Sequence, residues 1–116
     1  MRLLDCPVRT TADVIDGKWK PMIVNELKSG PLRFGQLLRN IREASRKVLT
    51  AQLRELEREE IVSRKVIGKK LERVEYALTP YGRTLVPVLT LMAAWGETHK
   101  VRKREKLSVG PELVSS

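Results

Sequence analysis

Two short helices separated by a tight turn dominate the middle of the sequence and narrow the choice of folds. The first shows the i, i+3, i+4, i+7 spacing of an amphipathic helix, in Phe34, Leu37, Leu38 and Ile41. After a turn over residues 40–44, Ser45 is a good N-cap for a basic helix whose inward face holds Leu49, Leu53 and Leu56. Two such helices predict a helix-turn-helix.

Further helices precede this pair. Thr10 or Thr11 is expected to cap a short helix over residues 12–15, which Gly17 would end. A second helix should begin near residues 18–20, because Pro21 is tolerated only in a first turn. Its apolar stripe consists of Trp19, Ile23 and Leu27, and the stretch at residues 29–31 (Ser-Gly-Pro) stops it.

A β-hairpin is predicted after the pair. Residues 61–67 and 74–78 are rich in β-branched and aromatic residues, and Val74, Tyr76 and Leu78 alternate with polar or small ones. The loop between them opens with Gly68 and carries Lys69, Lys70 and Arg73. The hairpin should therefore have a projecting, cationic tip.

The last predicted element is a long helix from residue 81 to about residue 104. Thr79 and Pro80 supply an N-cap and a first helical position, and Pro87 should kink the helix. Its apolar residues cover more than one face, which predicts packing against a second subunit. The expected dimer contacts are Leu85, Val88, Leu89, Met92 and Trp95.

The charge of the chain points to a polyanionic partner. With 23 Lys and Arg against 14 Asp and Glu, the formal net charge of the 116 residues is +9. Such a balance favours nucleic acid or an anionic membrane surface. No membrane-spanning run or secretory signal is present, and the single cysteine fits a reducing compartment, so the cytoplasm is expected.

Enzymatic chemistry has no support in the sequence. There is no constellation of nucleophile and base, no phosphate-binding glycine loop and no metal-ligand spacing, and His99 stands alone. We expect neither a catalytic residue, nor a cofactor, nor a metal. The basic run over residues 100–106 fits a solvated helix end that complements the helix dipole.

The chain resembles the HxlR family of winged-helix regulators over about residues 6–99. The resemblance rests on Cys6-Pro7-Val8, Gly17-Lys18-Trp19-Lys20, Gly30-Pro31-Leu32-Arg33-Phe34, Ser45-Arg46-Lys47-Val48-Leu49-Thr50, Gln52-Leu53-Arg54-Glu55-Leu56-Glu57, Val74-Glu75-Tyr76 and Leu78-Thr79-Pro80-Tyr81-Gly82. It implies a dimeric prokaryotic repressor or activator, often responsive to electrophiles or oxidants. The family often has proline in the wing loop, where this chain has Lys69-Lys70-Leu71-Glu72-Arg73, so the wing here is expected to be looser and more electrostatic in its contacts. Val48 stands where the family often has methionine, which is a conservative change on the helix.

The expected fold is therefore mainly α with a small β-hairpin, an α+β winged helix-turn-helix with terminal dimerisation helices. We expect a single domain. Residues 1–16 would form an arm and a short helix, residues 17–79 the winged helix-turn-helix, residues 80–105 the dimerisation helix and residues 106–116 a tail.

The basic helix is the expected reader of double-stranded DNA. A step of 100° per residue turns Lys47, Ala51, Glu55 and Arg58 outward when the leucines face inward. Arginine and lysine can bind guanine edges and glutamine adenine edges, whereas Ser45 and Thr50 suit phosphates. The full set of expected DNA contacts is Arg33, Ser45, Arg46, Lys47, Thr50, Ala51, Gln52, Arg54, Arg58, Lys69, Lys70 and Arg73. For Arg33 a structural role at the turn is equally compatible with the sequence. For Lys69, Lys70 and Arg73 an ordinary soluble hairpin tip is the lesser alternative.

Cys6 is a further candidate. A lone cysteine is usually a small apolar filler, but nearby Arg2 and Arg9 and a following helix would favour a reactive thiolate. The family resemblance implies a sensor of oxidants or electrophiles at this position in some members. Any disulfide would have to join two subunits or a small thiol.

Three functions fit these features to different degrees. A homodimeric, sequence-specific regulator predicts an inverted-repeat site with half-sites about one helical turn apart. A nucleic-acid-binding architectural protein without sequence preference would share the charge and the wing but select no such site. A winged helix that binds other proteins would be favoured only if its reading helix were neutral.

Overall fold

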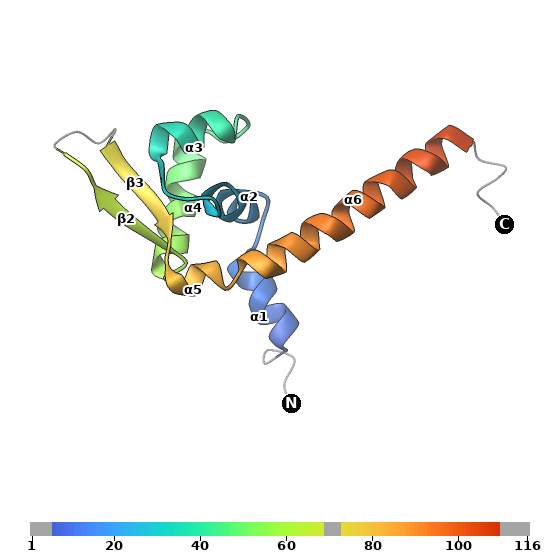
Figure 1. The fold of residues 1–116 in the computed structure, drawn as a ribbon, viewed down its shortest axis with the longest axis horizontal. Helices are drawn as coiled ribbons and strands as arrows, with labels where there is room; N and C mark the ends of the chain where they lie inside the picture. Colours follow the sequence, from blue (N-terminus) through green and yellow to red (C-terminus); the bar gives the residue numbers. More distant parts are fainter. Residues whose placement is uncertain (1–5, 69–72, 110–116) are drawn as a thin grey trace. The chain divides into compact units, whose positions relative to one another are not determined.

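The computed structural model describes residues 6–68 and 73–109, including side chains up to Leu107. By its internal contacts the chain divides into two compact units, residues 1–86 and residues 87–116. The first unit contains five helices and a small sheet among its described residues, and the second contains most of one long helix. This mostly helical fold with a small antiparallel sheet confirms the predicted fold class (Figure 1).

Three helices of the first unit lie close to their predicted positions. They are α2 (Trp19–Leu27), α3 (Phe34–Asn40) and α4 (Arg46–Arg58). Pro21 lies in the first turn of α2, where backbone N–H groups have no partner within the helix. The missing N–H of proline therefore costs no hydrogen bond there. The Ser45 hydroxyl accepts a hydrogen bond from the Val48 N–H at 3.1 Å, which confirms the N-cap of α4.

Helix α1 (Pro7–Val14) differs from the prediction, which placed the cap at Thr10 or Thr11 and the helix over residues 12–15. The helix begins five residues before the predicted range because Pro7, with its fixed φ, occupies the first helical position after Cys6. The two threonine hydroxyls instead donate back to carbonyl oxygens one turn earlier, Thr10 to Cys6 at 3.2 Å and Thr11 to Pro7 at 3.1 Å. They are therefore interior residues of α1 and not caps.

A three-stranded antiparallel sheet has the order β1-β3-β2, with β1 (Leu32–Arg33), β2 (Val62–Val66) and β3 (Val74–Leu78). The hairpin of β2 and β3 confirms the prediction. Strand β1 was not predicted, because two residues are too few to show an alternating pattern. It pairs with β3 through Leu32 opposite Tyr76 and Arg33 opposite Glu75.

The core of the first unit lies between the sheet and helices α2, α3 and α4. Figure 1 shows these three helices together beside the hairpin, and β3 contacts both α2 and α3. The predicted inward leucines of α4 and the alternating residues of β3 are all buried: Leu49, Leu53, Leu56, Val74, Tyr76 and Leu78. The first unit thus has an apolar core that fixes α4 against the sheet.

One charged side chain enters this core. Lys20 is only 9% exposed, and its Nζ donates to Oε1 of Glu55 at 3.2 Å. Glu55 was expected on the outward face of α4, and its side chain is 43% exposed while it pairs with Lys20. A buried ammonium needs an anionic partner, and one carboxylate oxygen of Glu55 supplies it while the rest of that side chain stays partly exposed.

A tight junction joins the end of α4 to the start of α5 (Pro80–Arg83). Glu60 has a φ of 61°, and the next residue, Ile61, accepts a hydrogen bond at its carbonyl from the Thr79 N–H at 3.0 Å. The Thr79 hydroxyl donates to the Glu60 carbonyl at 2.6 Å and accepts from the Gly82 N–H at 2.8 Å. The predicted cap at Thr79 is confirmed, and it also ties the two chain segments together.

The final helix was predicted as one kinked element, but it is two. The chain breaks after α5, and α6 runs from Val86 to Val109. Pro87 cannot donate to a carbonyl one turn back, so it lies in the first turn of a new helix instead of inside an old one. Among the described helices, none has the length and apolarity that crossing a membrane would require.

Candidate nucleic-acid interface

The outward face of α4 presents a group of basic residues. Five of the expected contacts on this helix are exposed: Arg46, Lys47, Ala51, Arg54 and Arg58. Ser45 is exposed at its start, and Thr50 is half-buried on its flank. Because the leucine face is fixed in the core, these side chains point away from it, as a reading helix requires.

Gln52 is less available than the sequence suggested. Its Nε2 donates to Oε2 of Glu55 at 3.4 Å, and the other oxygen of Glu55 accepts from Lys20. This chain of hydrogen bonds runs along the half-buried side of α4. One N–H of the Gln52 amide is thus engaged by Glu55 in the free protein.

Arg33 lies at the end of β1, directly before α3, and its side chain is exposed. Its backbone N–H donates to Oε1 of Gln36 at 2.9 Å, which closes the first turn of α3. Its backbone therefore has a structural role, while the guanidinium group stays accessible to solvent.

The hairpin adds cations beside α4. Arg73 is exposed, and its carbonyl accepts from the Ile67 N–H at 2.8 Å at the base of the loop. The predicted tip residues Lys69 and Lys70 lie outside the described residues. Arg64 and Lys65 on β2 are also exposed; sequence reasoning assigned them no role because it attended to the loop and not to the strand.

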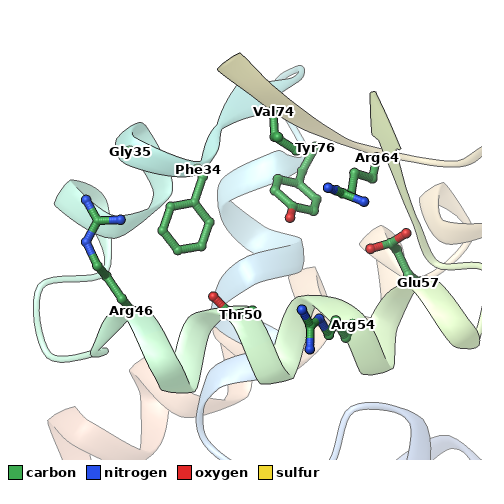
Figure 2. Close-up of a pocket in the computed structure, with 9 residues that line it drawn as sticks. All are labelled: Phe34, Gly35, Arg46, Thr50, Arg54, Glu57, Arg64, Val74 and Tyr76. Carbon is green, nitrogen blue, oxygen red and sulfur yellow. The ribbon is translucent and has the colours of Figure 1, made fainter. Parts of the chain in front are cut away.

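A hollow of about 470 Å³ lies where α3, α4 and the hairpin meet (Figure 2). Its lining comprises Phe34, Gly35, Arg46, Thr50, Arg54, Glu57, Arg64, Val74 and Tyr76. In Figure 2 the ring of Tyr76 projects from the sheet toward α4, with Arg64 beside it, and the Thr50 hydroxyl points into the space. The guanidinium carbon of Arg46 lies 5.7 Å from the centre of the Phe34 ring, within the range of a cation–π contact.

The position of Tyr76 in the wall of the hollow shifts the pKa of its phenol. Burial raises the pKa of its phenol above the usual value, and the positive charge of Arg64 opposes that rise in part. The hydroxyl is therefore protonated near neutral pH and serves as a neutral hydrogen-bonding group in the wall of the hollow.

Two further predicted features, Cys6 and the apolar residues of α6, belong to other segments of the chain. Cys6 is a free, half-buried thiol at the N-cap of α1. On α6, Val88, Leu91, Met92 and Trp95 follow an i, i+3, i+4, i+7 spacing, and their exposed fractions are 37%, 73%, 46% and 69%. Of the other expected dimer contacts, Leu85 is half-buried and Leu89 is buried.

His99 stacks on Trp95, with ring centres 5.0 Å apart. Within residues 6–68 and 73–109, no group of three or more histidine, cysteine or acidic side chains is arranged to hold a metal ion. The histidine thus belongs to an aromatic pair on α6.

Comparisons with known proteins agree on one kind of molecule. The model of the HxlR-like helix-turn-helix family matches residues 14–104. The chain is 44% identical over 97 residues to a Bacillus subtilis (strain 168) protein named as the uncharacterised HTH-type transcriptional regulator YdeP, covering 84% of this chain and 76% of that protein.

Solved structures give the same result. The redox regulator HypR in its reduced form aligns with a TM-score of 0.80 and 40% identity, covering 87% of this chain and all of that one. The reduced form of the transcriptional regulator YodB from B. subtilis aligns with a TM-score of 0.69 and 34% identity, covering 79% of this chain and 91% of that one.

Proposed function

Because this chain belongs to the HxlR-like helix-turn-helix family, and is thus a transcriptional regulator and not an enzyme, we propose that it binds a specific double-stranded DNA site as a homodimer. The observation that carries this proposal is the exposed basic face of α4, which includes Arg46, Lys47 and Arg54. Its side chains can reach base edges in a major groove, while the hairpin cations contact the backbone or the minor groove.

The homodimer is supported by the exposed apolar stripe of α6. Val88, Leu91, Met92 and Trp95 form one continuous strip, and large apolar side chains in such a strip are usually covered by a partner. We assign this strip to the subunit contact, and Leu85 and Leu89 remain further candidates for it. Two-fold symmetry then requires a DNA site with two inverted half-sites.

Selection of bound sequences from random DNA tests the proposal. It should be done at about physiological salt with an excess of nonspecific competitor DNA. We expect enrichment of an inverted repeat whose half-sites lie about one helical turn apart. Salt-sensitive binding without enrichment would favour an architectural protein instead, and a monomeric mass by light scattering at micromolar concentration would contradict the homodimer.

Cys6 is proposed as a redox-responsive residue, a role suggested by the structural similarity to proteins named as redox regulators. A hydroperoxide would oxidise its thiol to a sulfenic acid and be reduced to an alcohol. Condensation with a second thiol, from the partner subunit or a small molecule, would then form a disulfide and release water.

Oxidant treatment followed by DNA titration checks this role. We expect a hydroperoxide to change the DNA affinity of the unmodified protein several-fold and a reductant to restore it. Cys6→Ser replaces only the sulfur, so it should bind DNA normally and ignore the oxidant. A wild-type protein as unresponsive as Cys6→Ser would rule out this role for Cys6.

A further inference from the structure

The hollow between α3, α4 and the hairpin combines an apolar floor with a cationic rim. Phe34, Val74 and Tyr76 supply the apolar surface, and Arg46, Arg54 and Arg64 supply the cations. Its volume of about 470 Å³ falls within the roughly 300–1,000 Å³ typical of small-molecule sites. Such a lining is typical of a site for an organic anion.

The positive charges of the rim are not neutralised by acidic partners in the described part of the chain, although Arg64 also hydrogen-bonds to Tyr76. None of the three guanidinium groups forms an ion pair with a carboxylate of the described residues. Glu57 is the one carboxylate in the lining, so three positive charges stand against one negative charge. The hollow therefore attracts anions before any partner arrives.

The apolar floor distinguishes the ligand from a bare phosphate. A phosphate needs donors and cations but gains nothing from an aromatic surface, whereas an aromatic ring gains both burial and stacking. The Phe34 ring, with the guanidinium carbon of Arg46 at 5.7 Å from its centre, supplies an aromatic wall on one side. Hydroxyls of Thr50 and Tyr76 complete the lining with groups that can donate to a carboxylate.

We propose that this hollow binds a small planar aromatic carboxylate, and that the bound ligand competes with DNA. The ring packs on Phe34, Val74 and Tyr76, and the carboxylate faces the arginine rim. Competition follows because Arg46 and Arg54 belong to the reading helix and Arg64 to the hairpin. This second half of the proposal rests on the proposed function, since it requires that DNA use the same surface.

Calorimetric titration of the full-length protein without DNA tests the ligand site. The probe is 2-naphthoate, with 2-naphthamide as a neutral molecule of the same shape and inorganic phosphate as an anion without a ring. We expect saturable binding of 2-naphthoate and at least about tenfold weaker binding of the other two. Equal affinity for the acid and the amide, or no saturable binding of the acid, would overturn the site.

A pair of neighbouring substitutions locates the binding. Arg64→Gln removes a cation of the rim and should weaken 2-naphthoate at least about fivefold. Lys65→Gln removes the same charge from the next residue, which is equally exposed but does not line the hollow, and should leave the affinity unchanged. Equal losses in the two variants would mean binding by net charge alone and would contradict the proposal.

A DNA titration in the presence of 2-naphthoate tests the competition. If binding is mutually exclusive, ligand at ten times its own Kd raises the apparent Kd for DNA about elevenfold by mass action. Ligand binding with an unchanged DNA affinity would overturn the competition and contradict the DNA surface assigned above. Specific DNA binding without any ligand binding would overturn the ligand site and leave the proposed function intact.

Discussion

Gly82→Ala is expected to destabilise the protein by about 3 kcal/mol or more and to lower its Tm by roughly 12 °C or more. A Cβ atom at position 82 would overlap the carbonyl oxygen of Ile61 and approach the carbonyl carbon to 2.9 Å. That carbonyl cannot retreat easily, because it already accepts the hydrogen bond of the Thr79 N–H. The substitution must therefore push α5 away from the end of α4. Thermal and urea unfolding followed by circular dichroism would measure the loss.

Gly35→Ala is the matched control. Gly35 also lies in a helix of the first unit, but a Cβ there would meet nothing within 4 Å. Alanine has the higher helix propensity, so this substitution should leave the stability within about 1 kcal/mol of the wild type, on the favourable side. Equal Tm values for Gly82→Ala and Gly35→Ala would show that the junction accommodates a methyl group, contrary to its geometry.

Lys47→Ala should weaken binding to the selected DNA site by about tenfold or more while changing the affinity for random DNA less than about threefold. Lys47 lies on the exposed face of α4, in its first turn, where a side chain can reach a base edge. A good contact of this kind contributes about 1–3 kcal/mol of discrimination. Fluorescence anisotropy with both DNAs at one salt concentration would separate the two losses.

The double substitution Lys69→Ala and Lys70→Ala provides the contrast. Contacts of the wing with phosphates carry no sequence information, so binding to both DNAs should weaken alike, and the slope of log K against log salt should fall by about two. Lys28→Ala, an exposed lysine in the segment after α2, controls for the loss of a single charge. The same pattern of losses in Lys47→Ala and in the wing variant would contradict this division of roles.

Much of the fold was predictable because its signals are local. The leucine spacing of α4, the cap at Ser45 and the alternation of β3 each depend on a few neighbouring residues, and the structure confirms all three. Thr79 was equally predictable as a cap. The hydrogen bond from its hydroxyl to the Glu60 carbonyl was not predictable, because the two residues are nineteen positions apart in the sequence.

Several features that the sequence did not predict depend on contacts between distant segments. Helical geometry placed Glu55 on the outward face of α4 but could not reveal its ion pair with the buried Lys20 on α2. Strand β1 forms by pairing with β3, and its two residues are too few to show the alternation that predicts a strand. The hollow beside Tyr76 could not be predicted either, because its lining residues come from four separate elements, α3, α4, β2 and β3.

Strand β1 has an energetic consequence for recognition. It precedes α3 directly, and its pairing with β3 links the helix-turn-helix to the hairpin through Leu32 opposite Tyr76 and Arg33 opposite Glu75. The entropy of holding these two elements at a fixed spacing is therefore lost during folding and not during association. The heat-capacity change of complex formation should accordingly reflect the buried interface, with little contribution from ordering of this scaffold.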